Sequence, residues 1–446
     1  MVLGLVLGVA IAGCNERRIG PINPHTSRFF EKEVGNDGTA NVDVLFVIDD
    51  SGSMDEEQDS LRREIPLLVD ALTNPPLNED GVPRWNAVES LRIAIVTTDL
   101  GTSGAVASTS RVGTACAAND YLGKGGALVS ACGSGPVLTF EAGGDAAAFS
   151  AAVGCVADVG ITGCGLEQPL AAAVAALDQE DDFPRADALL AVVVLSDEED
   201  CSLEDPVAFF GGDETGVAIN QRCVREPGLL MPIDGLLAGL RAGRGDDQFL
   251  FAALVGLPEG LSGAAPADIL ASPEMAYDLT TENSLGLRPA CENARGQAAP
   301  GRRYVELASQ IDGALVSSIC AESFQPAITE LAARIGGRVN AVCATRSLTP
   351  DDNGAVQCEV RETLPEGMGC DALPSRSVYG IDEDGREVCV VTQAPRGEGT
   401  GWFYDTSDAT CEAVTYTDDA VPPFGTVVRL ECLVEVEIPT EDGPTG

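Results

Sequence analysis

Histidine is almost absent from this chain, whose 446 residues include a single one, His25. That residue lies in a polar, proline-containing stretch, where a solvated side chain is expected. The sequence also lacks any CxxC pair. Because zinc sites depend on histidines or closely spaced cysteines, a structural zinc site fits this chain badly. No GxSxG, HExxH, P-loop or GxGxxG motif is found, so the sequence gives little support to an enzyme.

Basic residues are scarce as well. Lysine and arginine together number 27 against 70 aspartates and glutamates, which gives a net charge of −43. This charge repels nucleic acid and anionic lipid surfaces, so neither is expected as a partner. Hydrophobic residues make up 45% of the chain and glycines number 50, which is typical of a folded, loop-rich protein. The length predicts two or three domains.

The N-terminal apolar run, Val2–Ala12, is too short to span a bilayer, which takes about 20 residues. It ends in Ile11-Ala12-Gly13-Cys14, which resembles a bacterial lipobox, so that Cys14 would be lipidated and become the first mature residue. The basic residues usual at the start of such a signal are missing. An ordinary secretory signal, cut near Gly13, is the alternative.

We therefore expect residues 1–14 to be a lipoprotein signal peptide and residues 15–40 to be a tether. By analogy with such lipoproteins, Asn15 after the cysteine favours the outer membrane of a Gram-negative cell envelope. Membrane contact is then expected only through the lipid on Cys14.

The 15 cysteines support export. If Cys14 carries lipid, an even number remains, which is consistent with disulfides formed in an oxidising compartment. Two pairings are suggested by position in the chain. Cys155 and Cys164 bracket a glycine-containing loop, and Cys291 could bond to Cys320.

Short buried strands alternate with helical patterns through the first three quarters of the chain. The strands are continuous apolar runs that end in polar turns. This alternation predicts right-handed βαβ units and hence an α/β fold, with a doubly wound, mostly parallel sheet flanked by helices. The expected strands are 44–48, 91–97, 137–140, 188–195, 249–256 and 314–319, and the expected helices are 56–72, 146–156, 170–177, 232–241, 304–310 and 324–335.

The α/β domain is expected over residues 41–337, with loop insertions at about 101–135 and 257–299. Composition changes after it, because residues 338–446 contain six cysteines, β-rich stretches and almost no helical period. The dipeptides Asn353-Gly354 and Asp384-Gly385 each precede a cysteine and favour type I′ hairpin turns. We expect a small disulfide-rich β domain there, in which the cysteine pairing stays open.

The first expected strand runs directly into the turn Asp49-Asp50-Ser51-Gly52-Ser53. Oxygen donors stand at alternate positions, Asp49, Ser51 and Ser53, so that a tight loop can direct all three inward. One carboxylate and two hydroxyls suit a hard divalent cation such as Mg²⁺. Ser53 and Glu56 also match a helix capping box, and both roles can hold at once.

This turn resembles the DxSxS signature of the von Willebrand factor type A (vWA) domain, whose metal-ion-dependent adhesion site (MIDAS) binds Mg²⁺ or a similar cation. The resemblance covers about residues 41–337. It implies a second ligating loop, where Thr162 stands, and an aspartate that contacts the metal directly or through water, where Asp197 stands. Asp99 and Glu198 are possible outer groups of the site. Mg²⁺ is the expected cation, with Ca²⁺ or Mn²⁺ as alternatives.

Asp49, Thr162 and Asp197 follow separate strands or precede helices, and in a parallel sheet those ends meet at one edge. Hydroxyls and two carboxylates only roughly neutralise Mg²⁺, so the cation would stay electrophilic and keep a position for water. In the resembled family, a carboxylate of a partner protein commonly replaces this water. We therefore expect a non-enzymatic envelope lipoprotein that binds a protein or another acidic ligand through the cation.

Two alternatives stay open. One is a structural envelope lipoprotein whose metal merely stabilises the loop. The other is a metal-dependent hydrolase, for which the acidic run 198–200 is the only candidate base.

Overall fold

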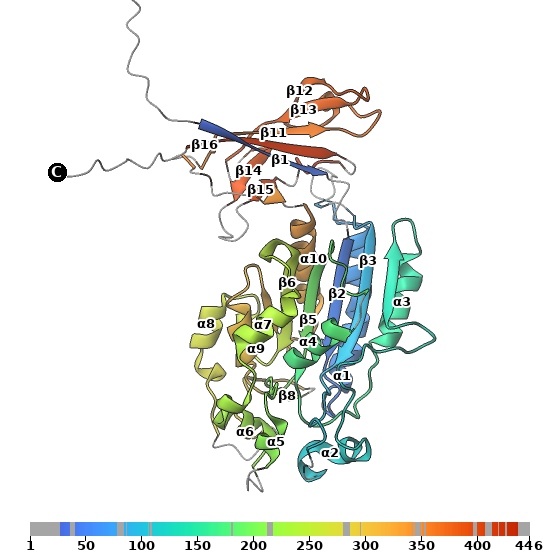
Figure 1. Ribbon diagram of the computed structural model, residues 1–446, viewed down its shortest axis with the longest axis vertical. Coiled ribbons are helices and arrows are strands. Elements are labelled where there is room, and N and C mark those ends of the chain that lie inside the picture. Colours follow the sequence, from blue (N-terminus) through green and yellow to red (C-terminus); the bar gives the residue numbers. More distant parts are fainter. Residues whose placement is uncertain are drawn as a thin grey trace, which may run out of the picture.

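A six-stranded sheet with helices on both faces forms the larger part of the chain (Figure 1). It is seen in a computed structural model of residues 1–446. The structure describes residues 27–435 except 36–40, 78–83, 86, 106, 108, 180–181, 212–216, 280–285, 295, 341, 344–347, 349, 352–353, 396–398, 406–412, 418 and 424–425.

The order of strands across this sheet is β4-β3-β2-β5-β6-β9. All neighbours are parallel except β3 and β4, so that β4 forms an antiparallel edge. Strands β2, β5 and β6 are buried almost throughout, which explains their continuous apolar sequences. The six expected strands are confirmed as β2 (Asn41–Ile48), β3 (Ser90–Thr97), β4 (Val137–Glu141), β5 (Leu189–Leu195), β6 (Phe249–Val255) and β9 (Leu315–Ser318).

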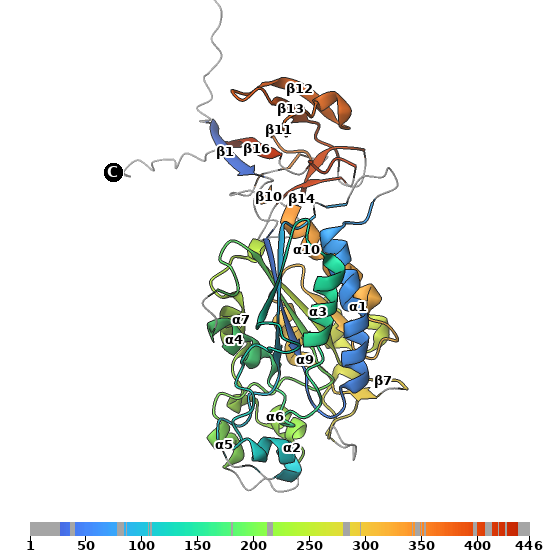
Figure 2. The same ribbon diagram turned by 90° about the vertical axis from the view of Figure 1, so that its right-hand side faces the viewer.

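Helices cover both faces of the sheet, which confirms the doubly wound α/β fold (Figure 2). One face carries α1 (Asp55–Thr73), α3 (Ala146–Val156) and α10 (Gln325–Asn340). The other carries α4 (Pro169–Gln179), α7 (Ile233–Arg241), α8 (Pro266–Ala271) and α9 (Arg302–Ala308). Successive strand residues point to opposite faces, so Phe46 packs in the first layer and Leu45 in the second. Among the helices that the structure describes, none is long and apolar enough to cross a membrane.

A further hydrophobic cluster lies at the carboxyl end of the parallel strands, at the bottom of Figure 1. Its helices are α2 (Thr109–Ala118), α5 (Pro206–Phe210) and α6 (Ile219–Arg225). The insertion expected at about 101–135 is therefore not only irregular loop, because α2 forms within it and packs through Val112 and Cys116. This cluster surrounds the edge of the sheet at which the candidate site lies.

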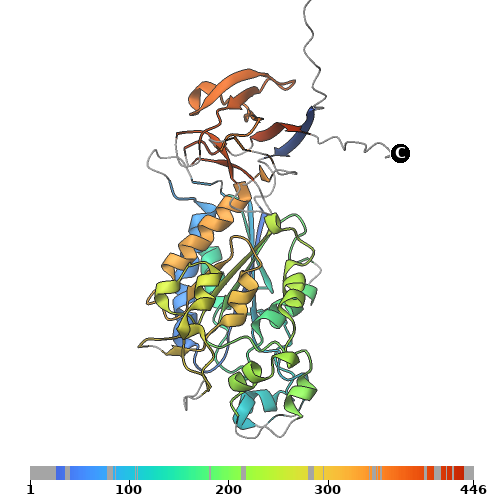
Figure 3. The same cartoon turned by 90° about the vertical axis from the view of Figure 1, so that its left-hand side faces the viewer.

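The C-terminal region forms the disulfide-rich β structure that the sequence predicts, and α10 leads into it (Figure 3). One sheet has the order β1-β16-β11-β13-β12 and the other the order β10-β15-β14. Their strands are β1 (Ser27–Gly35), β10 (Val342–Cys343), β11 (Cys358–Thr363), β12 (Arg376–Ile381), β13 (Glu387–Val391), β14 (Trp402–Asp405), β15 (Ala413–Tyr416) and β16 (Val427–Glu435).

The tether expected over residues 15–40 is wrong for Ser27–Gly35. This segment is β1, and it pairs antiparallel with β16 over its whole length. The pairing gives hydrogen-bond partners to a β16 edge that would otherwise be open. The segment therefore joins the C-terminal β structure, although almost the whole chain separates it from β16 in sequence. The rest of the expected tether, His25 and Cys14 lie outside the described residues.

The dipeptide Asp384-Gly385 lies in the β12–β13 hairpin, but the turn is not of type I′. Type I′ needs positive φ at both central residues. Gly385 has φ of 84°, whereas Asp384 is not among the residues with positive φ. A hydrogen bond from Gly385 N to Asp382 O (3.2 Å) instead marks a type I turn closed by a left-handed glycine. Asn353 lies outside the described residues.

Six disulfides join segments of the described residues, and they test the two expected pairings. The bond Cys291–Cys320 is confirmed. The bond Cys155–Cys164 is wrong, because each of these cysteines bonds to the insertion that contains α2 and not to the other. The observed pairs there are Cys132–Cys155 and Cys116–Cys164; the others are Cys201–Cys223, Cys358–Cys432 and Cys370–Cys389. Cys411 lies outside the described residues.

A buried ion pair offers a test of the β structure. Arg376 Nε lies 2.7 Å from Glu362 Oε2, and both side chains are 0% exposed. Replacing Arg376 by methionine leaves the Glu362 charge buried without its partner, so Arg376→Met should lower the free energy of unfolding by about 3–5 kcal/mol. Chemical denaturation followed through the fluorescence of the buried Trp402 measures this cost.

The double variant Arg376→Met/Glu362→Leu is the control, because it removes both charges and should recover most of the loss. A cost below about 1 kcal/mol for the single variant would contradict the buried pair.

Candidate metal centre

The turn after β2 places the three oxygen donors of the DxSxS motif together. Asp49 is fully buried, and its Oδ1 accepts a hydrogen bond from Ser51 N at 2.8 Å. The Ser51 and Ser53 hydroxyls lie 3.2 Å apart. Asp49 N donates to Leu195 O at 3.0 Å, which holds the start of the turn against the end of β5. Asp49, Ser51 and Ser53 are therefore neighbours in space.

Asp197 reaches the same turn from β5. Because β5 is the parallel neighbour of β2, the residues after both strands meet at one edge of the sheet. Asp197 is 6% exposed, and its side chain lies close enough to the Ser53 hydroxyl for Ser53 to lower its pKa. Beside it, the Ser196 hydroxyl donates to Asp49 Oδ2 at 2.5 Å. The four predicted residues Asp49, Ser51, Ser53 and Asp197 thus form one connected polar network.

Ser53 does not cap the helix that follows. The residue at the N-terminal boundary of α1 is Met54, and no side chain makes a capping hydrogen bond there. The Ser53 hydroxyl instead faces Ser51 and Asp197. Its place in the polar network, and not a role in the helix, accounts for its position.

The loop that contains Thr162 lies against the turn, although Thr162 itself is exposed. The contact runs through neighbouring backbone: Gly163 N donates to Asp50 O at 2.9 Å. Gln58 Nε2 also bridges the two segments, since it donates to Asp49 O and to Gly160 O at 2.9 Å each. The loop is therefore positioned beside the turn, and a metal-ligating role for the Thr162 hydroxyl stays a prediction.

The two possible outer residues lie on different sides of the turn. Asp99 is buried, and its Oδ1 accepts from Gly101 N at 2.9 Å. It neighbours Asp50, whose Oδ2 pairs with Lys124 Nζ at 2.5 Å. Glu198 follows Asp197 in the chain; burial and then the Asp49 charge raise its pKa, and the Asn220 side chain lowers it.

Glu167 belongs to this site and was missed by the sequence analysis. It lies two residues before α4, is 1% exposed, and its Oε2 accepts a hydrogen bond from Thr98 Oγ1. Thr98 is itself joined to the end of β2, because Thr98 N donates to Ile48 O at 3.3 Å, and this places the Glu167 carboxyl group near Asp49. The available signal was a glutamate beside Leu166 and just before the apolar helix α4, a context that predicts burial.

Burial is the main electrostatic fact of the site. It raises the pKa of Asp49, and it raises the pKa of Glu167 well above its usual range with the Asp49 carboxylate as the next cause. Burial, followed by the Asp49 charge, likewise raises the pKa of Asp197 strongly and that of Glu198 to about 7. The site therefore collects negative charge that the surrounding protein only partly stabilises.

The donor set fits a hard divalent cation. Asp197 Oδ1 and Glu167 Oε1 are buried and have no hydrogen-bond partner. Among the described residues, no three His, Cys, Asp or Glu side chains are grouped closely enough to hold a metal by themselves. A cation here would therefore depend on the hydroxyls of Ser51 and Ser53 as well as on carboxylates, as Mg²⁺ and related ions permit.

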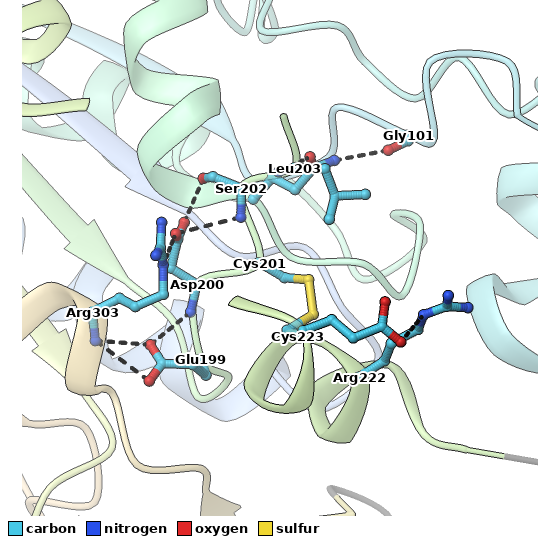
Figure 4. The surroundings of a disulfide bond; sticks show 11 residues. Gly101, Glu199, Asp200, Cys201, Ser202, Leu203, Arg222, Cys223 and Arg303 are labelled. Atoms are coloured by element: carbon cyan, nitrogen blue, oxygen red, sulfur yellow. Dashed lines mark hydrogen bonds and ion pairs between the residues drawn. A yellow bond between two sulfur atoms is a disulfide. The ribbon is translucent and has the colours of Figure 1, made fainter. Parts of the chain in front are cut away.

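The acidic run after β5 is not a solvated loop. Glu199 and Asp200 are 1% and 0% exposed. Figure 4 shows both turned toward Arg303, whose Nε lies 2.9 Å from Asp200 Oδ2 and whose N donates to Glu199 Oε1 at 3.1 Å. The disulfide Cys201–Cys223 follows directly. These contacts fix the backbone that carries Asp197 and Glu198.

A groove of about 490 Å³ opens beside the network. Ser53, Asp197 and Glu198 line it. Residues from the turn and second strand of the hairpin of β7 (Cys291–Glu292) and β8 (Gln297–Ala298) line it as well, and the bond between Cys291 and Cys320 anchors this hairpin. The groove gives a side chain from outside the protein direct access to Ser53 and Asp197.

Several solved structures are similar to this chain at low sequence identity. No family model and no curated protein matches this chain. Among solved structures, proximal thread matrix protein 1 from the mussel byssus in crystal form 2 is similar at 10% identity and a TM-score of 0.30, over 70% of this chain and 51% of that one. The same protein with a zinc-occupied MIDAS motif gives 12% identity, a TM-score of 0.28 and coverages of 68% and 48%.

The manganese-loaded TRAP protein of Plasmodium vivax is similar at 12% identity and a TM-score of 0.26, over 70% of this chain and 78% of that one. The chain spans about half the length of the mussel protein, 51% and 48% in its two structures.

Close packing between the two loops can be tested at Gly163. A Cβ added there would lie 2.4 Å from Asp50 Oδ1. Gly163→Ala should therefore push the two loops apart and lower the free energy of unfolding by about 1–3 kcal/mol. Gly154→Ala in α3 is the control, since its Cβ would meet nothing closer than Arg62 O at 3.9 Å. Equal denaturation midpoints for the two variants would contradict the contact.

The raised pKa of Glu198 predicts a pH dependence of stability. A buried acid whose folded pKa exceeds its unfolded value binds more protons in the folded state, so its stability contribution is full below the unfolded pKa. For Glu198 that contribution is lost as pH rises from about 4.5 through about 7. In metal-free buffer, Glu198→Gln should therefore flatten the fall in the free energy of unfolding across this range. Parallel curves for the variant and the native chain would show the prediction wrong.

Proposed function

We propose that this chain is a cation-dependent binding protein, in which Asp49, Ser51 and Ser53 hold a divalent cation with help from Asp197. Mg²⁺ is the cation that the donor set favours, and Ca²⁺ or Mn²⁺ are alternatives. A bound cation would supply an electrophilic centre at which a carboxylate of a partner protein can bind. The protein's own residues would hold and orient that centre, and no bond of the partner would be broken.

The observation that carries this proposal is the connected network of Asp49, Ser51, Ser53 and Asp197. It joins one strand end to the next and includes a buried carboxylate oxygen, Asp197 Oδ1, that has no hydrogen-bond partner. Such groups are costly to bury unless something outside the protein pairs with them. A divalent cation does so with the oxygen ligands available.

Access supports a binding role over a purely stabilising one. Ser53 and Asp197 border the groove, so a ligand can approach the network from solvent. Gly52 is exposed, and nothing lies within 4 Å of the position of an added Cβ, so the turn itself stays uncovered. A metal needed only to stabilise the loop would not require this opening.

The site lies at one end of the molecule, which supports attachment to the membrane at the opposite end. The network follows the carboxyl ends of β2 and β5, whereas β1 and the C-terminal β structure lie at the other end of the sheet (Figure 1). A lipid on Cys14 would anchor the chain ahead of β1 and direct the site away from the membrane. We propose on this basis a lipoprotein of the cell envelope that presents the site to its partner.

The proposal predicts that binding depends on Asp49. In pull-downs from envelope extracts, the native chain should retain a partner in Mg²⁺ and release it in EDTA, whereas Asp49→Asn should retain none in either buffer. Asp268→Asn, which changes an exposed aspartate of α8, is the matched control and should behave like the native chain. Circular dichroism checks that the variants are folded.

Retention of the same partner in EDTA would contradict the proposal. If Mg²⁺ raises the melting temperature but no partner is lost in EDTA, the cation only stabilises the loop. Divalent-dependent turnover of a substrate would indicate the hydrolase instead.

A further inference from the structure

We propose that Glu167 is a direct ligand of the cation, in the role that the resemblance assigns to Thr162. This inference rests on the proposed function, because it concerns how the same site holds its cation. It changes the chemistry of the site, since a carboxylate takes the place of a hydroxyl. The cation would then be held by Asp49, Ser51, Ser53 and Glu167, with Asp197 behind Ser53.

The positions of the two residues differ. Thr162 is exposed, and its loop reaches the turn through the backbone of Gly163. Glu167 is 1% exposed, and its hydrogen-bond partner Thr98 is joined to β2 at the residue before Asp49, because Thr98 N donates to Ile48 O at 3.3 Å. Both residues belong to the segment between α3 and α4, so the same segment supplies the ligand in either case. The structure buries the glutamate and leaves the threonine exposed.

Hydrogen bonds hold both the side chain and the backbone of Glu167 in place. Thr98 Oγ1 donates to its Oε2, and the backbone around it is fixed by bonds from Cys201 N to Glu167 O (2.9 Å) and from Gln168 N to Thr98 O (3.2 Å). Its other oxygen, Oε1, is buried and has no hydrogen-bond partner. A carboxylate that binds a metal is oriented in this way: a neighbouring hydroxyl donates to one of its oxygens, and the other oxygen binds the metal.

The charges around Glu167 also favour a cation beside its carboxylate. Its main electrostatic neighbours are the carboxylates of Asp49, Glu198 and Asp50. Lys124 is bonded to Asp50 and is 40% exposed, so it does not neutralise the buried pair. Neighbouring buried carboxylates repel each other and have lost their hydration, and a cation between them would offset both effects. If no cation binds there, cations will have no effect at Glu167.

A carboxylate ligand has a consequence for cation binding. It adds one negative charge inside the site compared with a threonine, so the protein itself neutralises more of the cation's charge. The cation should then bind without any partner present. Carboxylate ligands also suit Ca²⁺ and Mn²⁺, so the site should accept these ions as well as Mg²⁺.

The test uses the purified chain and the metal ions alone. In calorimetric titrations with MgCl₂, MnCl₂ and CaCl₂, Glu167→Gln should weaken cation binding about 10- to 100-fold. Thr162→Ala should leave it unchanged within about threefold, which is roughly the scatter of substitutions outside a site. Glu204→Gln, at an exposed glutamate, is the matched control.

Melting temperatures give a second readout that a merely structural role would not produce. In EDTA, Glu167→Gln should melt above the native chain, because one of the neighbouring buried carboxylates is removed. In MgCl₂, the same variant should lose most of the increase that the native chain shows. Raised stability without the cation, together with loss of the cation's effect, identifies a ligand.

The outcomes separate this inference from the proposed function. If Asp49→Asn abolishes cation binding while Glu167→Gln binds like the native chain, Glu167 is not a ligand and the proposed function stands. Loss of binding in Thr162→Ala but not in Glu167→Gln would also overturn the inference. If Asp49→Asn binds cations like the native chain, the proposed function itself fails.

Discussion

The burial of several acidic groups at the carboxyl edge of the parallel sheet is the constraint on which the rest of the site depends. Burial, followed by the Asp49 charge, raises the pKa of both Glu167 and Asp197, so the three carboxyl groups interact electrostatically. Carboxylates packed in this way repel each other and lose their hydration, so the folded state favours either protonation or a cation. The remaining features of the site position these groups or leave them accessible.

The surroundings keep this costly arrangement in one geometry. Gln58 holds two loops together through its amide, and Arg303 fixes the backbone after Asp197 by pairing with Asp200. The disulfides Cys116–Cys164 and Cys201–Cys223 tie the loops at this end of the sheet. The C-terminal β structure lies at the opposite end, where it includes β1 and leaves the site uncovered (Figure 1).

Local sequence patterns were sufficient for the α/β sheet and for the turn that carries Asp49, Ser51 and Ser53. Buried strands such as β5 are continuous apolar runs in the sequence, and the polar turn after β2 is recognised by its alternating oxygen donors. The same patterns could not place Glu167, because a single glutamate before a helix has many ordinary explanations. They also failed for Cys155 and Cys164, whose closeness in sequence suggested a bond that the packing of the insertion around α2 replaces by two others.

The sequence by itself determined the α/β class, the order of its strands along the chain and the turn that carries Asp49, Ser51 and Ser53. These follow from residue periodicity and from donors that are neighbours in the chain. Only the tertiary structure decided that Glu167 is buried against Thr98, that β1 pairs with β16 and which cysteines bond. The physical reason is that each of these features depends on contacts between residues far apart in sequence. Such contacts are determined by how the whole chain packs, and a local sequence pattern contains no information about them.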